Sequence, residues 1–353
     1  LGQRVLKGVR GLLSDRQLKI LQVIVDDFIR SNHPVGSRTL AKKKGISLSS
    51  ATIRNEMADL EELGLIEKTH ASSGRIPSEK GYRFYVDHLL SPAKIDTVDI
   101  QKIRSVFHDK IFEIEEIIQK SASVLSELTE YTAIVLGPIF NETKLNHFQI
   151  VPLNDRTAVA IIVTDTGHIE HRVFTLPESL DGSALEKTVN ILNERLSGIP
   201  LIQLQEKLEK EVRNLFRKYI DDYQTIFSAM LDVLNIPLEE KIYFGGKTNM
   251  LKQPEFQDIQ QLQQILDVLE EEKFVAYILN NIPLGIQVKI GSEIDIQEMH
   301  SCSLITATYR VGEKEVGKIA VLGPKRMHYS RVISILNLFS NQLTRELTKL
   351  YLE

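Results

Sequence analysis

Cysteine is nearly absent from this sequence of 353 residues, in which Cys302 is the single example. A lone thiol cannot form a disulfide within the chain, so the fold depends on packing and hydrogen bonds. Cys302 lies in the apolar stretch 302–305, which favours a buried and unreactive thiol. Because disulfides are typical of secreted proteins, this cysteine usage favours the cytoplasm.

Long hydrophobic runs are missing as well. No apolar segment of the sequence approaches the roughly 18–20 residues that cross a bilayer, and the N-terminus lacks the apolar core and small-residue cleavage site of a signal peptide. Hydrophobic residues make up 42% of the chain and charged residues 25%, as in soluble globular proteins. We therefore expect a cytoplasmic protein without a membrane partner, long enough for two or three domains.

Signatures of catalysis and metal binding are scarce. The stretch Gly-Gly-Lys-Thr at 245–248 resembles the end of a phosphate-binding loop, but Lys241 occupies the position where that motif needs a glycine, so a tight loop is the alternative. His168 and His171 would point to opposite faces of a strand, which does not make a chelate. We expect no enzyme, no cofactor and no metal site.

Charge is distributed unevenly along the chain. Residues 1–92 contain 15 lysines and arginines against 10 aspartates and glutamates, whereas residues 93–353 contain 28 against 37. A basic module attached to an acidic body confines the attraction for phosphates to one end of the molecule. The composition thus indicates nucleic-acid binding by the N-terminal part.

The segment 48–64 has the pattern of a recognition helix. Ile53, Met57 and Leu60 recur at helical spacing, and Gly64 stands where helices often end. Hydrogen-bonding residues fill the N-terminal turns, from which such a helix contacts phosphates and bases. The predicted contacts on this segment are Ser49, Ser50, Thr52, Arg54 and Asn55. By itself the pattern also fits an ordinary amphipathic surface helix.

The preceding segments favour DNA binding. Ser14 and Gln17 have the spacing of a capping box at the start of an apolar helix. Residues 36–45 have the pattern of a second, short helix, with Ser37 as its cap and Gly45 as its stop. Helix, short helix, tight turn and recognition helix is the order of a helix-turn-helix motif.

A hairpin completes the predicted N-terminal domain. Residues 65–77 alternate and turn like the β-hairpin wing behind a recognition helix, although the Ser-Ser-Gly loop alone would also suit a solvated turn. The predicted contacts to phosphates or a minor groove are Arg38, Lys68, His70, Ser73 and Arg75. We therefore predict a winged helix-turn-helix DNA-binding domain over residues 1–92.

The remainder of the chain has a mixed α+β pattern. Residues 100–131 have the spacing of one long helix, which could transmit strain to the DNA-binding domain or simply pack on a sheet. Residues 132–138 and 319–324 are apolar strands that both end in Leu-Gly-Pro, which indicates strands ending at a similar place in one sheet. Residues 147–176 have the pattern of a three-stranded antiparallel meander, followed by helices.

We predict that an insertion at 145–236 splits a second domain into residues 94–144 and 237–353. The helices of the insertion carry more apolar residues than a three-stranded sheet needs. The predicted dimer contacts are therefore Leu215, Phe216, Ile226, Phe227, Met230, Leu231 and Leu234. These side chains could instead form the insertion's own core.

Four stretches resemble the HrcA family, the heat-inducible transcription repressors of bacteria. They are Val-Gly-Ser-Arg-Thr-Leu at 35–40, Ser-Ala-Thr-Ile-Arg-Asn-Glu-Met at 50–57, Ser-Gly-Arg-Ile-Pro-Ser-Glu-Lys-Gly-Tyr-Arg-Phe-Tyr at 73–85 and Leu-Gly-Pro-Lys-Arg-Met-His-Tyr at 322–329. The similarity runs from about Leu13 to the C-terminus, and residues 1–12 depart from it.

The resemblance implies a repressor of chaperone operons that binds an inverted-repeat operator as a homodimer and is kept active by the chaperonin. It also implies a GAF-like sensor fold for the split domain and a dimerisation role for the insertion. Two other functions stay open at this point. One is a ligand-sensing module whose effector sets the affinity for DNA, and the other is an enzyme with an attached DNA-binding domain.

Overall fold

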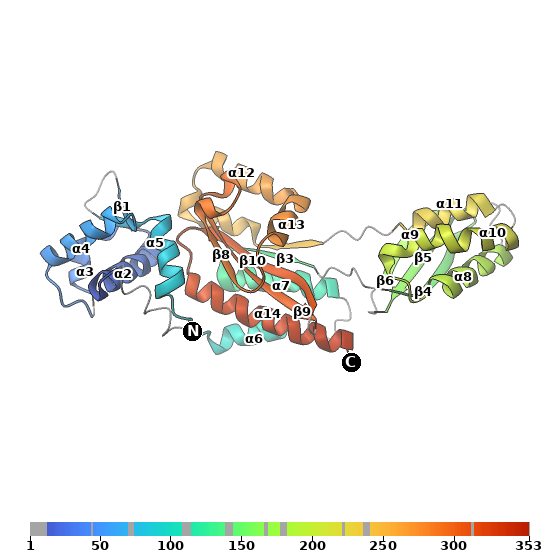
Figure 1. Ribbon diagram of the computed structural model, residues 1–353, viewed down its shortest axis with the longest axis horizontal. Helices are drawn as coiled ribbons and strands as arrows, with labels where there is room; N and C mark the ends of the chain where they lie inside the picture. Colours follow the sequence, from blue (N-terminus) through green and yellow to red (C-terminus); the bar gives the residue numbers. More distant parts are fainter. Residues whose placement is uncertain are drawn as a thin grey trace.

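The computed structural model describes residues 13–43, 45–69, 74–107, 114–137, 144–165, 169–176, 182–220, 223–235, 241–311 and 314–352. They form a helical N-terminal unit with a two-stranded hairpin, a central five-stranded sheet with helices, and a three-stranded sheet with its own helices. The N-terminal unit and the three-stranded unit lie at opposite ends of the central sheet (Figure 1).

The N-terminal unit has the predicted winged-helix order. Its elements are α2 (Asp15–Ser31), α3 (Ser37–Ala41), α4 (Ser50–Glu62), β1 (Ile66–Lys68), β2 (Arg75–Pro77), α5 (Glu79–Phe84) and the π-helical turn η1 (Tyr85–Leu89). The capping box is confirmed, because the Ser14 hydroxyl accepts a bond from the Gln17 N–H while the Gln17 side chain accepts one from the Ser14 N–H. This pairing satisfies two N–H groups that the helix leaves free.

The ends of α3 and α4 follow the prediction only in part. Ser37 is the first residue of α3 rather than its cap, a position that Gly36 occupies, and the helix ends at Ala41, well before Gly45. Ser49 caps α4 by accepting a bond of 3.1 Å from the Thr52 N–H. Gly64 has a φ of +71°, the left-handed conformation predicted for the residue after this helix.

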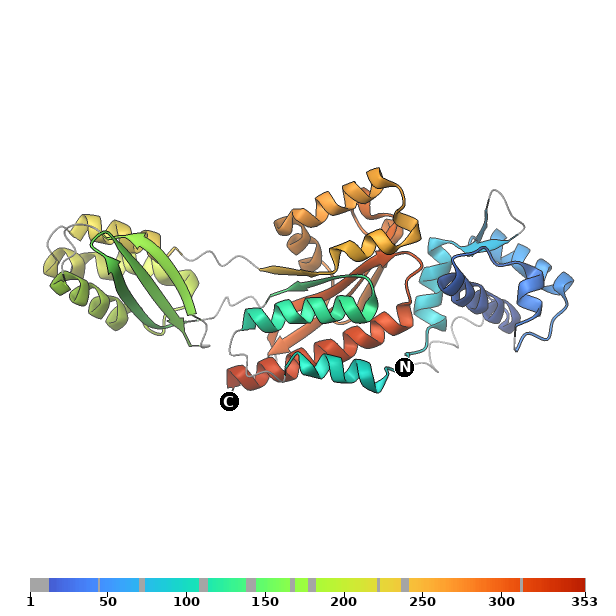
Figure 2. The same ribbon diagram turned by 180° about the vertical axis from the view of Figure 1, so that it is seen from behind.

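The central sheet is antiparallel throughout, with the strand order β7-β3-β10-β9-β8. Its strands are β3 (Thr132–Leu136), β7 (Ile242–Gly245), β8 (Gln287–Ile290), β9 (Cys302–Val311) and β10 (Lys314–Pro324). Helices cover both faces, which explains why β3 is a continuous apolar run rather than an alternating one. The face shared with the N-terminal unit carries α6 (Thr97–Ser105), α7 (Ile114–Thr129) and α14 (Tyr329–Leu352), and the other carries α12 (Ile259–Glu270) and α13 (Glu272–Asn280) (Figures 1 and 2).

Two predictions about this domain need correction. The single long helix over 100–131 is wrong, since α6 ends at Ser105 and α7 begins at Ile114. An unbroken helix of that length would extend roughly 48 Å. In the structure α7 packs on strands β3 and β7, and α6 turns back and packs against α7. The strands ending in Leu-Gly-Pro are neighbours in one sheet, as predicted. They run antiparallel, however, so the Leu-Gly-Pro end of one strand lies beside the beginning of the other.

The chain leaves the central sheet after β3 and returns to it at β7, which pairs with β3. Between them, β4 (Leu145–Asn154), β5 (Thr157–Thr164) and β6 (Ile169–Thr175) form the predicted antiparallel meander. Its helical elements are α8 (Gly182–Leu196), η2 (Leu201–Gln203), α9 (Leu204–Lys207), η3 (Leu208–Val212), α10 (Arg213–Tyr219) and α11 (Tyr223–Val233). The helices and the inner face of the sheet enclose a hydrophobic core separate from that of the central domain.

This core corrects the predicted dimer contacts. Five of these side chains are buried inside the insertion, and the other two are half-buried. The five are Phe216, Ile226, Phe227, Met230 and Leu234, and the two are Leu215 and Leu231. The five buried side chains leave no surface for a second chain, so most of the apolar surplus in these helices is the core of the insertion. Leu215 and Leu231 stay predicted contacts.

Candidate nucleic-acid interface

The exposed side of α4 presents a narrow stripe of short and hydrogen-bonding side chains. Ile53, Met57 and Leu60 are buried beneath the helix. The stripe consists of the exposed residues Ala51, Arg54, Asn55 and Ala58, at positions i, i+3, i+4 and i+7 of one helix face. Arginine and asparagine can each make bidentate hydrogen bonds to purine edges, and alanine can contact a thymine methyl group.

The alanines of this stripe were not among the predicted contact residues. A side chain of one carbon lets the helix backbone approach a groove closely, so Ala51 and Ala58 matter by being small. The helical spacing from Arg54 and Asn55 was visible in the sequence and is the signal that could have identified them.

Hydroxyl groups gather at the N-terminal end of the same helix. Ser49 is exposed, Ser50 and Thr52 are half-buried, and the hydroxyls of Ser49 and Thr52 lie 2.9 Å apart. Ser49 uses an acceptor lone pair for its cap, and one of the two hydroxyls donates to the other, which leaves the hydrogen of the second hydroxyl available to a phosphate oxygen. The positive end of the helix dipole favours an anion at the same place.

Two further predicted contacts are exposed on elements next to α4. Arg38 lies on α3 and Lys68 ends β1. His70 and Ser73 belong to the predicted wing tip and lie outside the described residues.

Arg75 does not fit its predicted role as a contact of the wing tip. It pairs with Lys68 in the last pair of the hairpin before the loop. Its guanidinium donates two hydrogen bonds to Glu61 of α4, of 2.8 Å from Nε and 2.6 Å from a terminal nitrogen, and its side chain is only 15% exposed. Arg75 therefore fastens the wing to the recognition helix, and we remove it from the proposed DNA contacts.

The phosphate-loop and metal hypotheses find no support in the described residues. Gly246 has a φ of +62°, and a Cβ there would fall 1.8 Å from the Ser126 hydroxyl. It therefore makes a tight turn, packed on α7, between the end of β7 and the 3-10 helix η4 (Lys247–Lys252). Within the described part of the chain, no three histidine, cysteine or carboxylate side chains gather as a metal site would require. Burial raises the pKa of the Cys302 thiol to about 12, which makes it unreactive at neutral pH.

Three helices, a hairpin behind the third helix and a hydrogen-bonding stripe on that helix define a winged-helix DNA-binding protein. Two family models match the chain. The winged helix-turn-helix transcription repressor, HrcA DNA-binding, matches residues 12–87, and the HrcA protein C-terminal domain matches residues 115–333. Because the second match alone covers more than half of the sequence, the chain belongs to the HrcA family. It is a DNA-binding transcriptional repressor of the heat-shock response.

Solved structures resemble the chain to very different degrees. A crystal structure titled "hypothetical protein" is 25% identical, with a TM-score of 0.69 over 96% of this chain and 99% of that chain. The IclR protein of Thermotoga maritima and the repressor BlcR of Agobacterium tumefaciens are each 13% identical. They cover 94% and 95% of this chain and 98% of their own, with TM-scores of 0.20 and 0.21, too low to support a shared architecture.

Among the described residues, no helix combines the length and the hydrophobicity needed to cross a membrane.

Proposed function

We propose that this repressor binds an inverted-repeat operator of chaperone operons as a homodimer, with α4 in the major groove, and that the chaperonin modulates its activity. The observation that carries the DNA contact is the exposed stripe on α4. Arg54 and Asn55 approach base edges between Ala51 and Ala58. Ser49, Ser50 and Thr52 contact phosphates from the start of the helix, Arg38 and Lys68 do so from either side, and His70 and Ser73 extend the contact through the wing.

The test of this function is selection of bound DNA from a random pool with the full chain. A recovered inverted repeat with two identical half-sites would support the proposal, because a two-fold dimer reads a two-fold symmetric sequence. Recovered DNA with a single half-site would contradict the dimer, and the absence of any enriched sequence would contradict sequence-specific binding.

The domain organisation is proposed to follow the same family. Residues 94–144 and 237–353 form a GAF-like sensor domain, which the five-stranded sheet with helices on both faces supports. Residues 145–236 form an inserted dimerisation domain. Its separate core supports this boundary, because a unit with its own core keeps its shape when two copies associate.

We place the dimer surface on the outer face of the three-stranded sheet. Helices cover the inner face, whereas the outer face lies uncovered in front of them in Figure 2. Val151, Val159 and Val173 stand side by side across the three strands, and Val173 is 65% exposed. In the next two rows Ile161 lies between Gln149 and His171, and Val163 lies between His147 and Ile169, which is 58% exposed.

The usual outward face of an antiparallel sheet carries polar side chains, whereas on this face valines and isoleucines occupy the middle strand β5 and the row of Val151 and Val173. Contiguous apolar surface of this kind marks an interaction site. A second copy is the occupant that fits, because it brings an identical apolar face and a two-fold axis pairs each patch with itself.

A pair of substitutions separates the wing's DNA contact from its structural support. Lys68→Ala is expected to reduce the slope of log affinity against log salt by about one unit, because one phosphate contact is lost. Arg75→Ala is expected to leave that slope unchanged and to lower stability by about 1 kcal/mol through loss of the partly buried pair with Glu61. Operator titrations at several salt concentrations and thermal unfolding measure the two effects. A reduced slope for Arg75→Ala would show that Arg75 contacts a DNA phosphate.

A further inference from the structure

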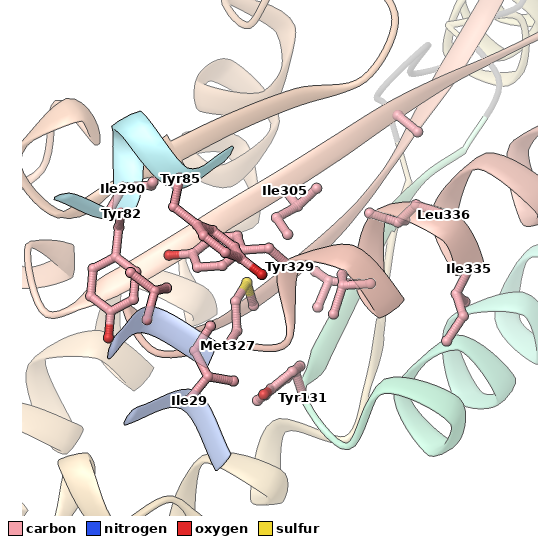
Figure 3. Packing of buried hydrophobic residues seen from close by; sticks show 14 of the residues in the cluster. Ile29, Tyr82, Tyr85, Tyr131, Ile290, Ile305, Met327, Tyr329, Ile335 and Leu336 are labelled. Carbon is pink, nitrogen blue, oxygen red and sulfur yellow. The ribbon is translucent and has the colours of Figure 1, made fainter. Parts of the chain in front are cut away.

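The N-terminal unit is packed directly on the central domain. Figure 3 shows Tyr82 and Tyr85, from α5 and η1, beside Met327 and Tyr329 of the central domain. The Tyr82 and Tyr329 rings lie 5.9 Å apart, and one continuous hydrophobic cluster contains core residues of both domains. We call this contact the joint: α5 and the end of α2 on one side, and residues 288–293, 325–329 and Glu255 on the other.

Glu79 at the start of α5 crosses the joint. Its carboxylate accepts hydrogen bonds from the Lys325 ammonium at 2.9 Å and from the Ser292 hydroxyl at 2.7 Å. Gly291 is built for this approach, because its φ is +55° and a Cβ there would fall 2.1 Å from a Glu79 oxygen. A larger residue at 291 would push the carboxylate away.

Two arginines cross the joint in opposite directions. Arg83 of α5 donates a hydrogen bond of 2.8 Å from Nε to Glu293 and one of 2.6 Å from a terminal nitrogen to the Val288 carbonyl. Arg326 of the central domain donates a hydrogen bond of 3.1 Å to the Ile29 carbonyl at the end of α2. Its guanidinium also forms an ion pair with Glu255. The joint is therefore held from two helices of the N-terminal unit, α5 and α2, which restrains rotation as well as separation.

The joint faces away from the proposed DNA surface. In Figures 1 and 2, α5 is the helix of the N-terminal unit nearest the central sheet, and α3 and α4 lie on the far side. The distinctive stretches at 78–85 and 322–329 meet at this contact. They therefore need a role other than touching DNA.

We propose that Glu79, Arg83 and Arg326 are positioning residues that set which operator spacing the dimer accepts. This role rests on the proposed function, binding of an inverted repeat by a dimer. Two recognition helices in one dimer must reach major grooves whose separation follows the helical repeat of about 10–10.5 base pairs. A DNA-binding domain held at one angle fits one half-site spacing. A domain connected only through the chain around residue 92 would reach several spacings with similar probability.

The exposure of these pairs suits a positioning role better than a stabilising one. The side chains of Arg83 and Glu293 are 29% and 38% exposed, and those of Lys325 and Glu79 are 37% and 34% exposed. Ion pairs open to water add little to the free energy of unfolding, whereas their directional hydrogen bonds still select one orientation. Variants of Glu79 and Arg83 are therefore expected to fold. The side chains of Arg326 and Glu255 are only 13% and 24% exposed, so thermal unfolding must show that the double variant is folded before its DNA binding is compared.

The test uses the full chain, an isolated half-site and a series of operators in which the spacer between the selected half-sites changes by up to five base pairs. The wild type is expected to prefer one spacing by roughly tenfold or more over a spacing changed by half a helical turn. The double variant Arg83→Gln/Arg326→Gln, and separately Glu79→Gln, should bind the half-site as the wild type does but discriminate between spacings by less than about threefold. Lys102→Gln is the matched control, since it breaks an exposed ion pair with Glu127 inside the central domain, and it should keep the wild-type preference.

Each alternative result has a distinct meaning. Unchanged spacing discrimination in the variants overturns the positioning role. Loss of half-site binding also overturns it, because the residues would then act within the DNA-binding domain itself. A wild type that binds operators of all spacings equally overturns the positioning role and leaves the proposed function intact, whereas a wild type that binds no DNA overturns the proposed function.

Discussion

Replacing Val151 and Val173 with glutamate is expected to convert the proposed dimer into a folded monomer. The two valines lie on the outer face of the insertion's sheet, on the two strands that flank Val159. In the dimer, each glutamate would lie against an apolar partner surface without a counter-ion. Burying such unpaired charges should weaken association by at least about 3 kcal/mol, roughly a hundredfold or more. The dissociation constant from sedimentation equilibrium measures this effect.

The fold of the insertion should survive the change. Val173 is largely exposed, and the two positions are separated by a strand, so the new carboxylates do not face each other directly. Ile202→Glu is the control, because it places the same charge at an exposed isoleucine on the helical part of the insertion. The control should remain dimeric. A double variant that dimerises like the wild type would exclude this face and move the interface to the central domain or to the DNA-binding domain.

The same substitutions should affect DNA binding in a defined way. Binding to an isolated half-site should stay unchanged, because α4 is untouched. Affinity for the full inverted repeat should fall towards that for the half-site, because the second recognition helix no longer arrives together with the first. Loss of half-site binding would instead indicate that the insertion supports the DNA-binding domain directly.

The dimer surface shows how far sequence patterns could go. The sequence predicted the meander, and the alternation of Val159, Ile161 and Val163 along β5 was visible in it. The prediction nevertheless assigned the dimer contacts to the apolar residues of the helices instead of those of the sheet. Period-two alternation marks two faces of a strand without saying which one the helices cover. That choice depends on how the helices pack, and here they cover the face of Ala158, Ala160 and Ile162.

Several local signals were reliable, although the predicted cap and stop of α3 at Ser37 and Gly45 were not. The capping box at Ser14 and the left-handed Gly64 depend on a few neighbouring residues, and both are present. The bond between Arg75 and Glu61 spans 14 positions and requires the wing to fold back onto α4. Nothing in the local pattern distinguishes an arginine held in this way from one that contacts phosphate.

The contacts of the joint could not be predicted from the sequence. Arg83 and Glu293 are 210 positions apart, and Glu79 and Lys325 are 246 apart. The motifs that contain Glu79, Arg83 and Lys325 were recognisable as stretches, but their meeting depends on the whole central sheet. Charged residues near a DNA-binding motif are easily assigned to DNA, and only the fold shows that these bind the neighbouring domain.

Arg54→Ala is expected to weaken binding to the selected operator by about 1–3 kcal/mol, which corresponds to roughly 5–150-fold. Arg54 is exposed on the stripe of α4, and the alanines at 51 and 58 leave room for its guanidinium to enter the groove. Binding to random DNA should change much less, because base contacts contribute to specific affinity whereas phosphate contacts contribute to both. Titrations against the operator and against random DNA at one salt concentration measure the two affinities.

Arg54→Lys is the matched variant, because it retains the positive charge and loses the planar fork that pairs with a guanine edge. It should bind random DNA as the wild type does and still lose most of the operator preference. If lysine restored operator binding fully, or if Arg54→Ala lost equal affinity for both DNAs, Arg54 would be a phosphate contact. Base recognition would then fall to Asn55 and the hydroxyl groups at the start of the helix.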